Sequence, residues 1–146
     1  MSHSDRAEAD RLSMIQPELY GAEAGGEVRL HGMRCICGHV AFPFHRLGCE
    51  RCGRTQGQEQ VALKAKGTLA AAVCVHLHMG SHHKAPFYLG AIRLDDGPMV
   101  RALLGGDGHP PGATVVGELV ESVSAVGTPG LDLRFTSRGA KGGAHA

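Results

Sequence analysis

Two closely spaced cysteine pairs constrain the fold of this chain more than any other feature of its sequence. Both pairs lie within eighteen positions, and each is followed by glycine: Cys35-Ile-Cys37-Gly38 and Cys49-Glu-Arg-Cys52-Gly53. A pair of this kind forms a tight turn that presents two thiolates, and two such turns together give the tetrahedral sulfur coordination that zinc favours. Because four protein ligands leave no open position for water or substrate, the sequence predicts one structural zinc, held by Cys35, Cys37, Cys49 and Cys52.

The cysteines leave three other interpretations open. They are buried or redox-active thiols, an iron site of the rubredoxin type, and a zinc site in which His39 or His45 replaces one cysteine. The first pair is Cys-x-Cys rather than the usual Cys-x-x-Cys, which strains its turn and puts one amide–sulfur hydrogen bond in doubt. The fifth cysteine, Cys74, lies in an apolar segment and is predicted to be inert packing.

The rest of the sequence is typical of a mostly β protein. Apolar and polar residues alternate over five segments, 69–79, 87–94, 99–104, 115–123 and 131–135, with glycine-rich turns between several of them. In the first segment, strict alternation places Leu69, Ala71 and Val73 on one face, and Cys74 and His76 on the other. Five short strands with such turns predict an OB-like Greek-key barrel.

Four parts are expected along the chain. Residues 1–26 form an N-terminal arm, in which the spacing of Met14, Ile15, Leu19 and Tyr20 predicts a short helix over 13–24 that must dock on another surface. Residues 27–56 form the zinc ribbon, and residues 57–136 form the OB-fold barrel. The glycine- and alanine-rich residues 137–146 are predicted to be a disordered tail.

Charge and hydropathy narrow the functional classes. The formal net charge is +1, with no Trp, two Tyr and four Phe, whereas a nucleic-acid-binding OB module needs a basic groove and aromatic stacking platforms. A zinc-ribbon/OB module that binds nucleic acid is therefore the alternative function rather than the first. The longest apolar run, 69–75, is too short to cross a bilayer, and the first residues lack an apolar signal core, so we expect a cytoplasmic protein without membrane association.

The ribbon and barrel together resemble the thiolase-associated, rubredoxin-like zinc-ribbon/OB-fold proteins over residues 15–136. The resemblance rests on the order of several short motifs along the chain: a strand running into Cys-Gly, Phe42-Pro43, Cys49-x-x-Cys52-Gly53, Lys66-Gly67-Thr68, Ala85-Pro86-Phe87-Tyr88 and Leu94-Asp95-Asp96-Gly97. The Cys35–Cys37 spacing departs from the usual first cysteine turn of that family, and this bears on the ligand geometry.

The resemblance implies an accessory subunit that acts in a hetero-oligomer with a thiolase-like catalytic subunit. That partner would supply the nucleophilic cysteine and the acid/base residues for thiolytic cleavage of a 3-oxoacyl-CoA, so a coenzyme A thioester would be the substrate of the complex. This chain would stabilise the catalytic subunit, help to shape its acyl-CoA site and contribute no catalytic residue. The resemblance also suggests a more specific relative, the small subunit of benzoylsuccinyl-CoA thiolase from aromatic degradation.

A histidine-rich stretch and two phenylalanines are the candidate contacts to the partner or to the substrate entrance. These residues are His76, His78, His82, His83, Phe42 and Phe44. Same-face positions on a strand lie roughly 6.5–7 Å apart, so two of Cys74, His76 and His78 could instead share a second metal. A polar barrel face or loop that meets a partner is the simpler interpretation of the histidines.

Overall fold

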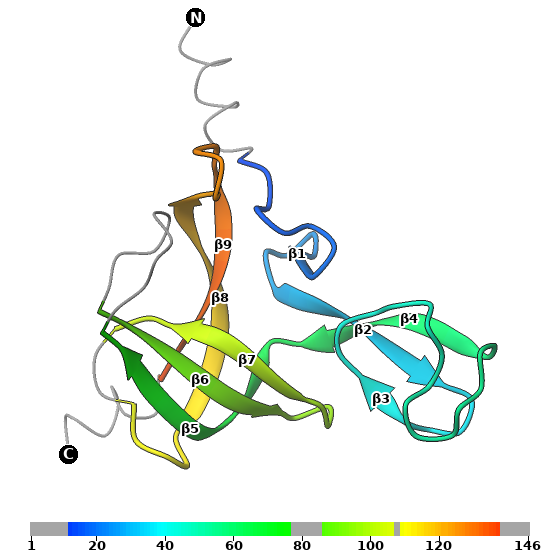
Figure 1. Cartoon of the computed structure of the whole chain (residues 1–146). Coiled ribbons are helices and arrows are strands. Elements are labelled where there is room, and N and C mark those ends of the chain that lie inside the picture. The colour runs from blue at the N-terminus through cyan, green and yellow to red at the C-terminus, as the bar shows by residue number, and fades with distance from the viewer. Residues whose placement is uncertain (1–11, 77–85, 107–108, 138–146) are drawn as a thin grey trace, which may run out of the picture.

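The computed structural model describes residues 12–76, 86–106 and 109–137, in which there is no helix and hence none that could span a membrane. The first four strands are β1 (Tyr20–Ala22), β2 (Val28–Cys35), β3 (Val40–Ala41) and β4 (Gln58–Lys64). The next five are β5 (Lys66–Val75), β6 (Phe87–Leu94), β7 (Met99–Leu104), β8 (Thr114–Val123) and β9 (Pro129–Thr136). Figure 1 shows a small sheet and a barrel, joined where β4 runs into β5.

The small sheet, which we call the ribbon, is built around β2. β1 pairs antiparallel with the first residues of β2. β3 pairs antiparallel with the last residues of β2, along the same edge. β4 pairs antiparallel along the other edge, from Arg29 opposite Lys64 to Cys35 opposite Gln58. Because Cys35 is the last residue of β2, the sheet places the first cysteine pair at the end of the ribbon away from the barrel (Figure 1).

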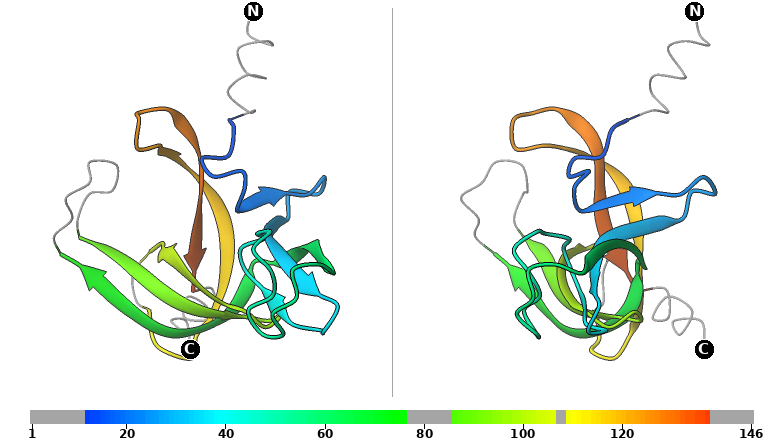
Figure 2. Two further views of the ribbon diagram at one scale, coloured as in Figure 1. Left: turned by 45° about the vertical axis from the view of Figure 1, so that its right-hand side comes forward. Right: turned by 90° about the vertical axis from the view of Figure 1, so that its right-hand side faces the viewer.

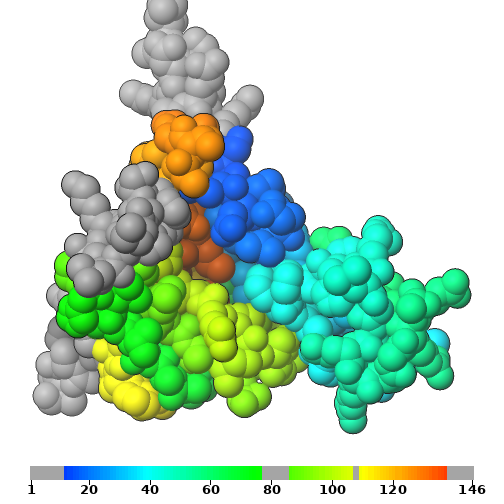
Figure 3. Space-filling view, viewed as in Figure 1, coloured from blue at the N-terminus to red at the C-terminus, as the bar shows by residue number. Residues whose placement is uncertain are grey.

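The five remaining strands close a barrel in the order β5–β6–β7–β9–β8, and β8 returns to β5. β9 lies out of sequence between β7 and β8 and runs parallel to β7, as a Greek-key barrel of the OB type requires. The predicted five-stranded barrel is confirmed. β7 and β9 pair only at Leu104 and Phe135 and diverge from that point (Figure 2), and β9 is visible at the bottom of a hollow between β7 and the arm (Figure 3).

The helix predicted over 13–24 is wrong, because the described part of the arm is extended and belongs to the barrel wall. Leu131 on β9 donates its N–H to the Ser13 carbonyl and accepts the Ile15 N–H, both at 2.9 Å. A turn over 16–19 then leads into β1. A helix of two turns is unstable by itself, whereas the extended arm satisfies backbone groups of β9 where β7 has diverged.

A β-bulge in β5 also corrects the predicted alternation over 69–79. The register shifts between Leu69, which pairs with Ile92, and Ala71, which pairs with Ala91. One extra residue reverses the two faces of the strand beyond it, so Leu69 is fully buried while Val73 is 59% exposed. Strict alternation places these two side chains on the same face, and the bulge separates them.

One hydrophobic core is shared by the ribbon and the barrel. Leu30 and Leu63 from the ribbon belong to the same buried cluster as Ile92 and Phe135 from the barrel. Each of these side chains is at most 3% exposed. The ribbon therefore has little core of its own beyond the cysteine cluster, and it depends on the barrel for apolar burial.

The connection between the two parts is short and well bonded. Only Ala65 separates β4 from β5, and its carbonyl accepts the Gly117 N–H of β8 at 2.7 Å. Asp96, in the β6–β7 hairpin, accepts the Lys64 N–H at 2.9 Å through its carboxylate. These contacts from two barrel elements fix the direction in which the ribbon leaves the barrel.

Gly67 on β5 allows β6 to approach closely, and we expect Gly67→Ala to be destabilising. A Cβ at residue 67 would lie 2.2 Å from the Arg93 carbonyl oxygen, which is backbone of the paired strand. Relieving this contact must shift β6, so the free energy of unfolding should fall by about 2 kcal/mol. Chemical denaturation followed by circular dichroism measures the change. Gly25→Ala is the control, since a Cβ there meets nothing within 4 Å; equal losses in the two variants would contradict the packing.

Candidate metal centre

The four paired cysteines converge at the end of the ribbon. Their Sγ atoms all lie within 4.8 Å of one another, with Cys35 and Cys52 3.6 Å apart and Cys37 and Cys49 3.7 Å apart. A tetrahedral ion bound to sulfur at about 2.3 Å needs sulfurs about 3.8 Å apart, so this cluster can hold a metal ion. Among the described residues, no other group of three or more histidine, cysteine or acidic side chains is arranged to do so.

Each cysteine pair lies on a turn closed by backbone hydrogen bonds. Gly38 donates its N–H to the Cys35 carbonyl at 2.8 Å, and Gly53 donates to the Cys49 carbonyl at 2.9 Å. The two glycines have φ values of 96° and 79°, which lie in the left-handed region that favours glycine. The glycine after each pair is therefore required by the shape of the turn that presents the thiols.

Gln58 belongs to this centre and was missed in the sequence. It is the first residue of β4, directly opposite Cys35 in the ladder, and its Nε2 lies 3.4 Å from the Cys35 Sγ. The same amide group donates to the carbonyls of Arg54 and Gln56, at 3.1 and 3.0 Å. One side chain thus ties the first cysteine turn to the segment that follows the second. Only the β2–β4 register brings it there, and a glutamine in a polar linker carries no metal-site signal.

Hydrogen bonds, burial and the neighbouring thiols shift the pKa values of Cys35, Cys49 and Cys52 in different directions. The Cys37 amide and the Gln58 side chain stabilise the Cys35 thiolate and lower its pKa to about 6. Backbone amides of the second turn likewise lower the pKa of Cys49. A backbone amide also lowers the pKa of Cys52, but burial and the neighbouring thiols outweigh it and raise that pKa to about 11. A bound divalent cation would complete the ionisation by stabilising all four thiolates.

Neither nearby histidine joins the sulfur cluster. His39 lies with its Nε2 3.0 Å from the Glu50 carboxylate, a contact between the two cysteine turns. The Nδ1 of His45 accepts the Leu47 N–H at 3.2 Å. Both rings are therefore engaged in contacts around the centre, and the ligand set that the geometry supports is four sulfurs.

The two phenylalanines between the cysteine pairs have different surroundings. Phe42 packs against the shared core and lines a cavity beside the barrel. Phe44 lies under the Arg46 guanidinium, whose carbon is 5.3 Å from the ring centroid. The backbone N–H of Phe44 donates to the His31 carbonyl at 2.9 Å. Phe42 therefore connects the ribbon to the barrel, whereas the contacts of Phe44 with Arg46 and His31 lie within the ribbon.

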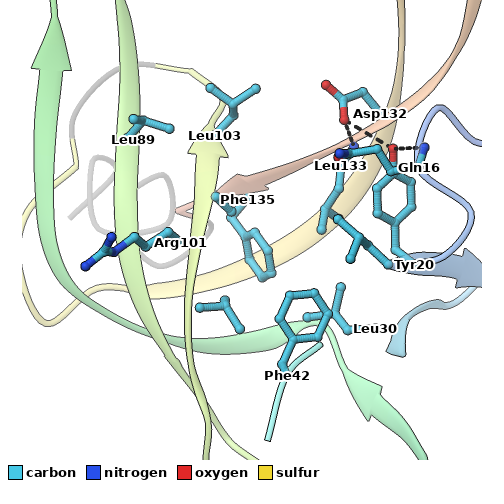
Figure 4. A pocket seen from close by; sticks show the side chains of 13 residues that line it. Gln16, Tyr20, Leu30, Phe42, Leu89, Arg101, Leu103, Asp132, Leu133 and Phe135 are labelled. Carbon is cyan, nitrogen blue, oxygen red and sulfur yellow. Dashed lines mark hydrogen bonds between the residues drawn. The ribbon is translucent and has the colours of Figure 1, made fainter. Parts of the chain in front are cut away.

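The cavity has a volume of about 200 Å³ and lies between β7, β9 and the arm. Figure 4 shows its apolar side, formed by Leu30, Phe42 and Phe135, and its polar end, where Tyr20 and Asp132 meet. The cavity lies in the wedge-shaped gap between β7 and β9, because the two strands pair only at Leu104 and Phe135 and diverge beyond that pair. The cavity is therefore a consequence of the barrel topology and of the arm that covers one side.

Asp132 is buried at the polar end of the cavity and is fully paired. One carboxylate oxygen accepts the Leu133 N–H at 2.9 Å and the Tyr20 hydroxyl at 3.2 Å. The other oxygen accepts the Arg134 guanidinium at 2.7 Å. The Tyr20 hydroxyl also lies 3.0 Å from the Leu131 carbonyl, so this network fastens β1 to β9 without an unpaired charge.

Most of the histidine-rich stretch falls outside the described residues, including His78, His82 and His83. His76 is described just after β5, where its Nδ1 lies 4.0 Å from the Cys74 Sγ. Cys74 is partly exposed rather than packed in the core. The interpretation of a second metal shared by Cys74, His76 and His78 stays a prediction, because His78 lies outside the described residues.

Burial and the negative charge of Asp132 raise the pKa of Tyr20 from 10.0 to about 12. Between pH 10 and pH 12 the unfolded chain loses this proton while the folded chain keeps it, so stability falls as the pH rises through that window. We expect a loss of roughly 2 kcal/mol, which Tyr20→Phe should not show. Denaturation curves of both chains across the window measure it. Parallel losses in the two chains would show that Tyr20 is not the group responsible.

Comparison with known proteins shows a likeness in fold to solved structures. No family model matches the sequence, and no curated protein matches it. Among solved structures, a chain of the structure described as "Ltp2-ChsH2(DUF35) aldolase" superposes with a TM-score of 0.57 and 20% sequence identity, covering 73% of this chain and 84% of that chain. At that identity the likeness shows the fold alone. Over the matched part, the chain thus shares its fold with a chain of that aldolase structure.

Proposed function

We propose that this chain is a zinc-containing accessory subunit of an acyl-CoA thiolase complex. The observation that carries the proposal is a four-sulfur centre in a chain whose fold matches a chain of an enzyme structure. That structure is described as an aldolase, and aldolases make or break carbon–carbon bonds. Thiolases break a carbon–carbon bond as well, which places the two activities in related chemistry.

Zinc is the ion we propose for the centre. Four thiolates at tetrahedral spacing suit zinc, and they fill its coordination sphere, so the ion has no position for water or substrate. Its role is then to hold the two cysteine turns together and to fix the loop that carries Phe42 and Phe44. A ribbon that has little core of its own needs such a fastening.

The described residues offer no catalytic set, which is why the proposal needs a second chain. Four of the five cysteines are the proposed ligands. Among the described residues, Cys74 has the Nδ1 of His76 4.0 Å from its Sγ, which is beyond the reach of about 3.2 Å that an activated nucleophile needs. The thiolase-like partner would supply the cysteine that attacks the keto carbon of a 3-oxoacyl-CoA. The bond between the α- and β-carbons then breaks, and the departing acyl-CoA enolate takes a proton from the partner's acid. A second coenzyme A thiol takes the acyl group from the partner's cysteine, which is released as the thiol.

The finer parts of the proposal concern substrate and contacts. The proposed substrate is a 3-oxoacyl-CoA, with aromatic benzoylsuccinyl-CoA as the specific candidate. The proposed contacts to the catalytic subunit or its substrate entrance are Phe44 and the stretch His76, His78, His82 and His83. This chain would stabilise the catalytic subunit and shape the acyl-CoA site at that contact.

The test is thiolysis measured for each chain separately and for both together. The second chain is a thiolase-like protein, sought first among the products of the neighbouring genes, and acetoacetyl-CoA and benzoylsuccinyl-CoA are compared as substrates. We expect co-purification of the two chains, turnover only by the mixture, and preference for the aromatic thioester. Turnover by this chain alone, or full turnover by the partner alone, would refute the accessory role. Binding to single-stranded nucleic acid without complex formation would favour the alternative function.

A further inference from the structure

The β6–β7 hairpin fixes the direction of every backbone group on β7. The Leu94 N–H bonds to the Pro98 carbonyl at 2.9 Å, and the two strands then pair without a register shift. In an antiparallel ladder, hydrogen-bonded pairs recur at every second residue, so Val100 and Ala102 direct their N–H and C=O groups to β6. The alternate residues direct theirs away from β6, into the wedge, and form what we call the β7 edge: Met99, Arg101 and Leu103.

The facing edge of β9 has its backbone groups satisfied within the described chain. Phe135 accepts the Gly105 N–H at 2.9 Å, at the one point where β7 and β9 pair. The Leu133 N–H bonds to the Asp132 carboxylate at 2.9 Å. Leu131 is bonded by the extended arm through both its N–H and its carbonyl. The arm and Asp132 therefore protect β9, and β9 leaves no partner for Met99, for Arg101 or for the Leu103 N–H.

The β7 edge remains open as a result. Within the described ranges, the outward backbone groups of Met99 and Arg101 and the outward N–H of Leu103 have no hydrogen-bond partner, whereas the Leu103 carbonyl belongs to the single pairing of β7 with β9 at Leu104 and Phe135. The hollow beside it holds the cavity of about 200 Å³, whose walls include Val100 and Ala102. An unpaired edge next to an apolar cavity is a template for one further strand, with the cavity taking side chains from one of its faces.

Charge indicates which kind of strand fits. All the charged residues of β5, β6 and β7 are cationic: Lys66, Arg93 and Arg101. Arg101 lines the rim of the cavity, and none of the described carboxylates lies within ion-pair distance of it. The one carboxylate that lines the cavity, Asp132, is already paired with Arg134. A strand beside the β7 edge would therefore be favoured by an acidic side chain opposite Arg101 and by apolar side chains directed into the cavity.

We propose that the β7 edge binds an extended segment of the partner subunit as an added strand, with alternating apolar and acidic residues. The apolar residues enter the cavity, and an acidic residue on the other face pairs with Arg101. This proposal rests on the proposed function for the identity of the partner. The chemistry of the segment follows from the edge, the cavity and Arg101.

Amide hydrogen exchange by NMR tests the edge directly. The probe is an end-capped five-residue peptide of alternating valine and glutamate, and its matched control carries lysine in place of glutamate. We expect saturating glutamate peptide to slow exchange of the Arg101 and Leu103 amides by at least about tenfold, while the Val100 and Ala102 amides, already bonded to β6, stay unchanged. The lysine peptide should bind at least about tenfold more weakly. Absence of protection at millimolar glutamate peptide would overturn the proposal.

Two variants test separately the charge of Arg101 and the outward backbone N–H of Leu103. Arg101→Glu should reverse the preference between the two peptides without changing the strand. Leu103→Pro removes only an outward N–H and should abolish binding of both peptides while the β6–β7 ladder persists. Unchanged peptide preference in Arg101→Glu would overturn the assignment of the acidic position, even if Leu103→Pro failed to fold.

The same exchange measurement on the complex with the thiolase-like chain distinguishes this proposal from the proposed function. Slowed exchange at Arg101 and Leu103 in the complex supports both. If a complex forms but these amides exchange as fast as in the chain alone, the proposed docking site is overturned and the proposed function is not affected. If no complex forms, the proposed function fails, and the peptide experiment alone decides whether the β7 edge binds an added strand. Protection that rises with protein concentration alone indicates pairing of two copies and overturns the proposal.

Discussion

Cys49→Ser should reduce bound zinc from about one ion per chain to almost none and unfold the ribbon. Cys49 is buried, and its thiol lies 3.7 Å from the Cys37 thiol across the cluster. Serine cannot replace a thiolate ligand, and the three remaining thiols cannot complete the four-sulfur coordination that holds the two cysteine turns together. Structural zinc contributes about 10–16 kcal/mol of folding free energy in small zinc domains, which exceeds what the rest of the ribbon can supply.

Elemental analysis and the circular dichroism spectrum of the purified chains measure this effect. Cys74→Ser is the matched control, because Cys74 lies on β5 away from the cluster and should retain the full zinc content. The barrel should persist in Cys49→Ser with lowered stability, since its core includes ribbon residues. Iron with a red colour in the wild-type chain, or a folded ribbon without metal, would contradict the zinc assignment.

Asp132→Ala should lower the free energy of unfolding by about 3 kcal/mol and release the arm from β9. The substitution removes the acceptor for the Leu133 N–H, for the Tyr20 hydroxyl and for the Arg134 guanidinium at once. Arg134 is then left beside a half-buried network without its counterion, which adds to the loss.

Denaturation curves give the stability, and faster amide exchange at Ile15 reports release of the arm. Asp96→Ala is the control, since Asp96 is exposed and accepts one backbone N–H, that of Lys64. That variant should cost about 1 kcal/mol or less and leave the arm bound. Similar effects of the two substitutions would show that the Asp132 network does not fasten the arm.

Local chemistry made part of this fold predictable. The cysteine spacing identified the residues that cluster, because each pair with its glycine encodes one turn. The Asp95-Asp96-Gly97 turn follows from local turn chemistry, because Asp and Gly tolerate positive φ, and it is present with Gly97 at a φ of 122°. The strands over 87–94 and 99–104 match the alternation and the turn between them. Each of these features is decided within a few residues.

Features that depend on distant partners could not be predicted from the pattern. The arm has helical spacing, yet it is extended because Leu131, far along the sequence, offers it backbone partners. The bulge after Leu69 depends on how β6 pairs with β5, and alternation alone cannot reveal an inserted residue. Gln58 reaches Cys35 only through strand register. The role given to His78, His82 and His83 stays a prediction, because they lie outside the described residues.

The bond from Gln58 to Cys35 makes two distant positions interdependent. The first turn is one residue shorter than a Cys-x-x-Cys turn, and the Gln58 side chain supplies Cys35 with a donor from the neighbouring strand. A related chain with the longer turn would carry a further amide of its own there and would be released from this requirement. Among relatives, an insertion into the first turn should therefore be accompanied by loss of the amide side chain opposite its first cysteine, so that turn length and residue 58 change together in evolution.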